Sequence, residues 1–115
     1  MRSANDMLHG TLDVLILRAL AWSPMHGYAL ANWIGERASG ELEIADAALY
    51  KALHRLEASG AIDAHWGLSE NNRRAKYYSL SPRGRKVLTA ELETWRRFAR
   101  AVAAVLEPAD TRGRS

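Results

Sequence analysis

Basic side chains gather in one stretch of the sequence, where they could bind phosphate. Residues 71–90 carry six Lys and Arg side chains and no Asp or Glu. These are Arg73, Arg74, Lys76, Arg83, Arg85 and Lys86. Contacts to phosphate need only positive charge and hydrogen-bond donors, and they carry no sequence information. The stretch therefore indicates a surface that binds a nucleic acid or another anionic partner.

The charge of the whole chain is polarised in the same direction. With 16 Lys and Arg against 13 Asp and Glu, the formal net charge is only +3. Residues 1–70 hold five basic and nine acidic groups (net −4), whereas residues 71–115 hold eleven and four (net +7). A chain polarised in this way often presents one basic surface to an anionic partner. A solvated charged helix is the alternative interpretation.

The residue types that catalysis and metal binding require are scarce or scattered. There is no Cys, which excludes disulfides, thiolate nucleophiles and cysteine-bound metals. The four histidines fall on separate predicted elements without metal-ligand spacing, at His9, His26, His54 and His65. There is no G-x-S-x-G motif and no Gly-rich phosphate loop. The sequence predicts no enzyme, no metal site and no cofactor.

Length and hydropathy limit the class of protein further. A chain of 115 residues suits one compact domain. The longest apolar run, residues 101–106, is six residues and far too short to span a bilayer. The N-terminus lacks the apolar stretch and cleavage site of a signal peptide. We therefore expect a cytoplasmic protein without a membrane partner.

Three helices are predicted in the first half of the chain. Apolar residues recur at steps of three and four over residues 7–22, with Asp6 as a plausible N-cap and Pro24 ending the helix. A second helix is predicted over 26–38. A third, over 46–59, places three leucines on one face and stops at Gly60. Those leucines are Leu49, Leu53 and Leu56.

Shorter elements are predicted between and after these helices. Residues 41–44 alternate polar and apolar, which indicates at most a short strand. Residues 61–66 and 75–78 read as two strands around a polar turn, that is, a β-hairpin. Ser81 and Pro82 then provide a hydroxyl N-cap followed by proline at the first helical position, which is a strong helix start.

The last predicted helix, over residues 81–106, carries an apolar seam spaced four, three, four, three and four. That spacing is typical of a helix that packs lengthwise against another helix. At 1.5 Å per residue the helix is about 39 Å long. The seam could pack on the first helix of its own chain or on a second subunit. We favour the second subunit, because three short helices cannot cover such a length. The seam places six residues at the predicted dimer interface: Leu88, Leu92, Trp95, Ala99, Val102 and Leu106.

The predicted order is helix, helix, short strand, helix, hairpin, long helix. It indicates a mainly α (α+β) fold, a winged helix-turn-helix with a β-hairpin wing and a long C-terminal dimerisation helix. Residues 1–80 would form the DNA-binding domain, 81–106 the dimerisation helix and 107–115 a flexible tail. Opposite the leucine face of the third helix, Tyr50, Lys51 and Arg55 could reach bases or phosphates. An ordinary amphipathic surface explains each of these residues equally well.

Several motifs, in order, resemble the PadR family of bacterial transcriptional regulators. They are LHGTL at 8–12, PMHGY at 24–28, ALYKALHRLE at 48–57, RRAKYY at 73–78 and LSPRG at 80–84. The resemblance covers residues 7–106 and is closest to the short subgroup with a single C-terminal helix. It implies a homodimeric repressor that binds double-stranded DNA at a palindromic operator. It also implies that the terminal helices form the dimer interface, which adds Leu8 and Leu12 of the first helix to the seam.

The resemblance also implies roles for single residues. Tyr28 would lie on the helix before the recognition helix and Tyr50 and Lys51 on the recognition helix itself. Arg73, Arg74 and Lys76 would lie on the wing. Family members often have Ser-Pro-Gly-Thr where this chain has residues 45–48, with the sequence ADAA. Asp46 suits the helix dipole but would repel a nearby phosphate.

Two further functions are compatible with the sequence. Short members of the family often sense small hydrophobic or aromatic compounds. Trp95 would face its symmetry mate, where paired indoles can sandwich a flat effector; alternatively it fills the dimer core.

The competing class of function is a protein-interaction module, whose basic wing meets an acidic partner without sequence-specific DNA binding. The dimer seam together with the basic wing favours a two-fold DNA site.

Overall fold

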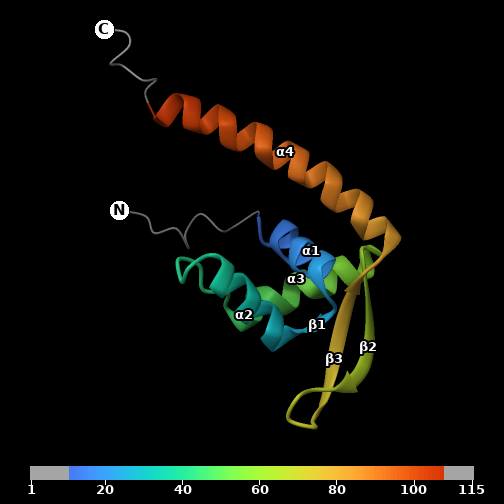
Figure 1. Ribbon diagram of the computed structural model, residues 1–115. Coiled ribbons are helices and arrows are strands. Elements are labelled where there is room, and N and C mark those ends of the chain that lie inside the picture. Colours follow the sequence, from blue (N-terminus) through green and yellow to red (C-terminus); the bar gives the residue numbers. More distant parts are fainter. Residues whose placement is uncertain (1–10, 108–115) are drawn as a thin grey trace, which may run out of the picture.

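A computed structural model describes residues 11–107 of the protein. In chain order its elements are α1 (Leu12–Trp22), β1 (Met25–His26), α2 (Gly27–Arg37), α3 (Asp46–Ala58), β2 (Ile62–Leu68), β3 (Arg74–Leu80) and α4 (Pro82–Leu106) (Figure 1). The three strands form an antiparallel sheet in the order β1-β3-β2. Helices dominate and the sheet is small, so the predicted winged helix-turn-helix is confirmed.

Helix α1 is the centre of the core. It packs against α2, α3, α4 and β3, and its residues Ile16, Leu17 and Ala19 are almost completely buried. A helix buried on several sides needs apolar residues beyond one stripe, which explains the wide apolar pattern of this segment. In the described residues the helix begins at Leu12, after Thr11; the predicted start at Met7 lies outside them. The predicted N-cap Asp6 and the interface residue Leu8 lie outside the described residues.

The short strand lies elsewhere than predicted. Residues 41–44 form no strand; instead Met25 pairs with Tyr78 and His26 with Tyr77 of β3. The chain is extended at Ser23, just before Pro24, because a residue that precedes proline is disfavoured in the α region. This extension carries residues 25–26 along the edge of β3. The true order is therefore helix, short strand, helix, helix, hairpin, long helix.

Helix α3 follows its predicted pattern closely. Leu49, Leu53 and Leu56 are buried in the core, so their face is the inner one, as predicted. The helix ends at Ala58, and Gly60 follows with a φ of 82°. This left-handed conformation is the usual C′ geometry for glycine. Burial of the leucines fixes which side chains of α3 face solvent.

The hairpin of β2 and β3 extends away from the helices (Figure 1). Both strands run further than predicted, and residues 69–73 form the turn. Ile62 and Tyr78 anchor the base of the hairpin in the core. Successive side chains along each strand point to opposite faces of the hairpin. Trp66 and Lys76 lie directly opposite each other and therefore share one face. The hairpin therefore has a buried base and an exposed tip, as a wing does.

Helix α4 starts as predicted and then leaves the body of the protein. The Ser81 hydroxyl accepts the Gly84 N–H at 3.0 Å, and Pro82 occupies the first turn. Leu88 is buried and Leu92 packs against the same core. Beyond these residues α4 diverges from the other helices (Figure 1). Within residues 11–107, no helix is apolar enough over a sufficient length to cross a membrane.

The predicted seam of α4 is thus divided between two surroundings. Leu12 and Leu88, both assigned to a dimer interface from the sequence, are buried inside the chain's own core. Leu92 packs at the edge of that core. The later seam residues Trp95 and Leu106 are exposed. The N-terminal part of the seam therefore packs inside its own chain. Packing on a second subunit stays a prediction for the remainder of the seam.

Candidate nucleic-acid interface

The contact between α2 and α3 sets the exposed surface of the helix-turn-helix. The Tyr50 ring of α3 lies directly over the backbone of Gly27, where a Cβ atom would overlap the phenol. His26 caps α2, since its Nδ1 accepts the Ala29 N–H at 3.1 Å. Gly27 thus lets the recognition helix approach the N-terminus of α2 and brings Tyr28 and Tyr50 to one surface. Tyr28 is 74% exposed and Tyr50 47% exposed.

The solvent face of α3 offers few charges. Ala47, Tyr50, Lys51 and His54 are exposed there and line a shallow hollow that extends to Arg55. The N-terminal half of a recognition helix usually contacts base edges. Lys51 is the cation in that half, because Arg55 lies in the last turn. Ala45, at the N-cap, makes no side-chain capping bond.

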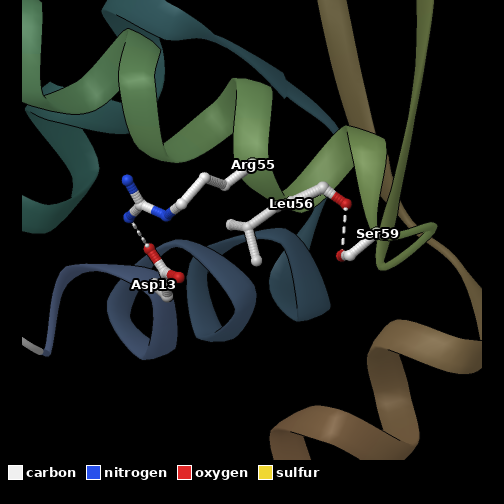
Figure 2. A network of polar contacts seen from close by, with 4 residues as sticks. All are labelled: Asp13, Arg55, Leu56 and Ser59. Carbon is white, nitrogen blue, oxygen red and sulfur yellow. Dashed lines mark hydrogen bonds and ion pairs between the residues drawn. The ribbon is translucent and has the colours of Figure 1, made fainter.

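Arg55 is turned toward α1. Its Nη2 lies 2.6 Å from Oδ1 of Asp13, and Figure 2 shows the guanidinium reaching across from α3 to that carboxylate. Both side chains are substantially exposed, 61% and 40%. An exposed ion pair of this kind contributes less than about 1 kcal/mol to stability. Arg55 is thereby held on the side of α3 that faces α1, where a phosphate would have to compete with Asp13.

The three wing cations have different surroundings. The Arg74 guanidinium lies over the Trp66 ring, 4.4 Å from its centroid. Lys76 Nζ lies 3.5 Å from Oε1 of Glu57 at the end of α3, and 5.7 Å from the centroid of the Tyr78 ring. Arg73 belongs to the turn, where its backbone exchanges hydrogen bonds with Ser69. Lys76 thus links the wing to the recognition helix, and Arg74 lies further toward the tip.

A groove lies between the wing, the N-terminus of α2 and the face of α3. The aromatic rings of Tyr28, Tyr50 and Trp66 line it together with the cations Arg73, Arg74 and Lys76. Tyr78 also lines the groove, and its burial raises its pKa above the ordinary value. Tyr78 is therefore a neutral phenol at physiological pH and adds no negative charge to the groove. Aromatic faces beside cations are well suited to the sugar-phosphate backbone of DNA.

Most of the DNA-binding residues predicted from the sequence lie on one side of the molecule. Tyr28, Tyr50, Arg73, Arg74 and Lys76 line the groove, and Lys51 and Arg55 flank it on α3. The other half of the basic run, residues 83–86, begins α4 at the base of the hairpin. The length of β3 separates it from the tip, about 20 Å for seven residues.

Sequence reasoning missed Trp66, His26 and His54 as lining residues of this groove. A signal for Trp66 was present, because it alternates along one hairpin face with the same period as Arg74 and Lys76. His26 gave no local signal, since only β1 and the cap of α2 bring it there.

Within residues 11–107, no group of three His, Asp or Glu side chains is placed to hold a metal ion.

A second candidate surface follows the free half of α4. Trp95 and Phe98 lie one turn apart with their ring centroids 5.9 Å from each other. Trp95 is 45% exposed, and Phe98, Val105 and Leu106 are more exposed still. Contiguous exposed apolar side chains on a soluble chain usually mark an interface.

These features define a winged helix-turn-helix protein of the transcription-regulator class. The model of the family described as "Transcriptional regulator PadR-like family" matches residues 16–90. The chain therefore belongs to the PadR-like family of transcriptional regulators, and the resemblance seen in its motifs is confirmed.

Individual proteins agree with this assignment. An uncharacterised protein of Lysinibacillus sphaericus is 30% identical over 91 residues, which cover 79% of this chain and 84% of that protein. A transcriptional regulator from Clostridium thermocellum has a similar structure, with a TM-score of 0.80, 27% identity and coverage of 89% and 99% of the two chains. A PadR family transcription regulator from Clostridium difficile matches with a TM-score of 0.69 and 29% identity over 82% and 95%.

Proposed function

We propose that this regulator is a homodimeric repressor that binds a palindromic operator through its wing and α3. The observation that carries the proposal is the groove lined by three exposed aromatic rings and three cations beside the free face of α3. One sugar-phosphate strand would run along the groove, while α3 would enter the adjacent major groove. A bacterial regulator of transcription acts on the chromosome, so we also propose a cytoplasmic location.

On α3, we assign base reading to Tyr50 and Lys51. Both are exposed in the N-terminal half of the helix, and a good side-chain contact to a base is worth about 1–3 kcal/mol of discrimination. Asp46 in the first turn repels phosphate and suits the helix dipole instead. Phosphate contacts would therefore come from the wing rather than from the start of α3.

Fluorescence anisotropy with labelled duplexes tests the proposed function. One duplex is taken from upstream of the protein's own gene and the other is its scrambled counterpart, each titrated at low and near-physiological salt. We expect binding to the native duplex to survive the higher salt, because base contacts do not release counterions. Absence of binding to either duplex would instead favour the protein-interaction module, in which the basic wing meets an acidic partner.

Replacement of Arg74 by alanine should weaken binding to the native and the scrambled duplex by the same factor. Arg74 is exposed at the wing, and a phosphate contact contributes affinity without sequence information. The slope of log affinity against log salt should become shallower by about one unit for each phosphate that Arg74 neutralises in the wild type. Lys86→Ala removes the same charge from the base of the hairpin and should change both quantities little. A loss confined to the native duplex would contradict a phosphate-binding role for Arg74.

The dimer is proposed to form along the exposed face of α4. Paired copies would present two recognition helices to half-sites about 34–36 Å apart, one turn of DNA. A small hydrophobic or aromatic effector bound between the two α4 helices would change their spacing and release the operator. Trp95 supports this site, because it is exposed on α4 and already has an aromatic neighbour in Phe98.

A planar aromatic probe such as acridine should quench part of the tryptophan fluorescence of the wild type. In Trp95→Ala this quenching should disappear, because the stacking surface is removed. Trp22, Trp33 and Trp66 contribute emission to both proteins, so the quenched fraction is the quantity to compare. Equal quenching in the two proteins would contradict an effector site at Trp95 and leave this residue as part of the dimer core.

A further inference from the structure

We propose that Trp66 is a positioning residue that holds Arg74 ready for a DNA phosphate. The role rests on the proposed function and adds to it a residue that makes one wing cation effective. Trp66 is 57% exposed although tryptophan is among the largest apolar side chains. It contributes little to the core, and the guanidinium of Arg74 lies over its ring.

The hairpin register brings these two side chains together. Trp66 lies directly opposite Lys76, and Leu68 lies directly opposite Arg74. Arg74 is thus the diagonal neighbour of Trp66 on the same face of the sheet, within reach of long side chains. Its guanidinium carbon lies 4.4 Å from the centroid of the ring, inside the range of cation–π attraction.

The chemistry of the contact leaves Arg74 able to bind an anion. A guanidinium carries its N–H donors in its own plane, whereas the indole ring covers one of its faces. The ring therefore restricts the side chain without occupying the donors or cancelling the charge. A carboxylate partner would offset part of the charge, as Glu57 does for Lys76, whose Nζ lies 3.5 Å from Oε1 of Glu57. The wing thus separates two tasks: Lys76 braces the wing against α3, and Arg74 binds phosphate.

A double-mutant cycle in the full-length protein tests this role. Trp66→Leu is measured alone, in an Arg74→Ala background and in an Arg73→Ala background, with the scrambled duplex at low salt. We expect Trp66→Leu to weaken binding about fivefold, since the Arg74 side chain on each wing of a dimer must then be ordered when DNA binds. The loss should persist with Arg73→Ala and vanish with Arg74→Ala. Trp66→Phe should restore most of the affinity, because a ring is again available.

A measurement on the free protein separates positioning from general structural support. The Arg74 Nε–H proton should show an upfield ring-current shift in the wild type and in Trp66→Phe, and lose it in Trp66→Leu. Far-ultraviolet circular dichroism should stay unchanged, and the thermal midpoint should fall by only a few degrees, because the indole is largely exposed.

The outcomes distinguish this role from the proposed function. If the wild type binds DNA but Trp66→Leu costs as much with Arg74→Ala as without it, Trp66 acts independently of Arg74. The positioning role is then wrong and the proposed function stands. An absent ring-current shift would overturn it equally. If the wild type binds neither duplex at low salt, the proposed function itself fails and the role of Trp66 in DNA binding fails with it.

Discussion

Replacement of Gly84 by alanine should destabilise the protein by about 3 kcal/mol, the upper part of the range for overpacked sites. Gly84 is buried in the first turn of α4, where the helix lies against the backbone that follows α3. A Cβ atom at this position would overlap the carbonyl oxygen of Ala61. It would also lie 3.0 Å from the carbonyl carbon of Ala61 and 2.8 Å from Cδ1 of Leu80. The carbonyl belongs to the backbone and cannot rotate away, so α4 itself must move.

That movement would break the bonds that fix the start of α4. The Ser81 hydroxyl lies 2.6 Å from the carbonyl oxygen of Gly60 and 2.9 Å from that of Ala61. The same hydroxyl oxygen accepts the Gly84 N–H, and the Ser81 N–H donates to the Ala61 carbonyl at 3.1 Å. These bonds are part-buried or buried, and a buried polar group left without a partner costs about 1–3 kcal/mol. The cost of the added methyl group therefore includes the disruption of this junction.

Gly35→Ala is the matched control. At Gly35, inside α2, a Cβ atom would meet only the Leu42 carbonyl oxygen at an ordinary 3.8 Å. Alanine is the better helix former by about 1 kcal/mol, so Gly35→Ala should stabilise the protein slightly. Urea unfolding followed by circular dichroism measures both free energies. A Gly84→Ala variant as stable as the wild type would show that α4 shifts without losing its bonds.

The parts of the fold that local sequence determines could be predicted. The spacing of Leu49, Leu53 and Leu56 defines the inner face of α3 because a helical repeat follows from a few residues. Ser81 and Pro82 determine the start of α4 in the same local way. The strand β1 could not be predicted, because two residues have no measurable period and Met25–His26 is extended only through its pairing with β3.

The candidate site was predictable by residue type but not by role. The sequence identified Arg55 as a cation on α3, yet its partner Asp13 lies 42 residues earlier in the chain. Arg74 and Lys76 have the same charge and lie on the same face of the hairpin. Only the fold shows that Arg74 contacts Trp66 and that Lys76 contacts Glu57. Such pairings depend on tertiary placement. The charge pattern therefore indicated a basic surface, but it did not show which contacts each basic side chain makes.

The apolar seam of α4 illustrates the same limit on a larger scale. A 3.5-residue repeat predicts a helical partner but does not identify it. In the structure Leu88 is buried in the chain's own core, and Leu92 packs at the edge of that core. Trp95 and Leu106 continue the repeat on the exposed part of α4. We propose a second copy of the chain as the partner of this exposed continuation, and a substitution there should then separate the two copies.

Replacement of Val102 by glutamate should convert the proposed dimer into monomers and lower operator affinity more than about 100-fold. Val102 lies on the seam between Trp95 and Leu106, beyond the part of α4 that packs on the core. Two glutamates facing each other near a two-fold axis would bury like charges, which is strongly unfavourable. A monomer binds one half-site alone and loses the effective concentration, of the order of millimolar, that joins two half-sites.

Ala104→Glu provides the matched control on the same helix. Ala104 is exposed and, two residues from Val102, lies about 200° around the helix from it, so the same charge is added away from the seam. Sedimentation equilibrium should give about twice the chain mass of 12.8 kDa for the wild type and Ala104→Glu, and the single mass for Val102→Glu. Anisotropy should show the loss of operator affinity in Val102→Glu alone. A Val102→Glu protein that stays dimeric and binds normally would place the dimer interface away from α4, and the effector site at Trp95 would then have no second indole to complete it.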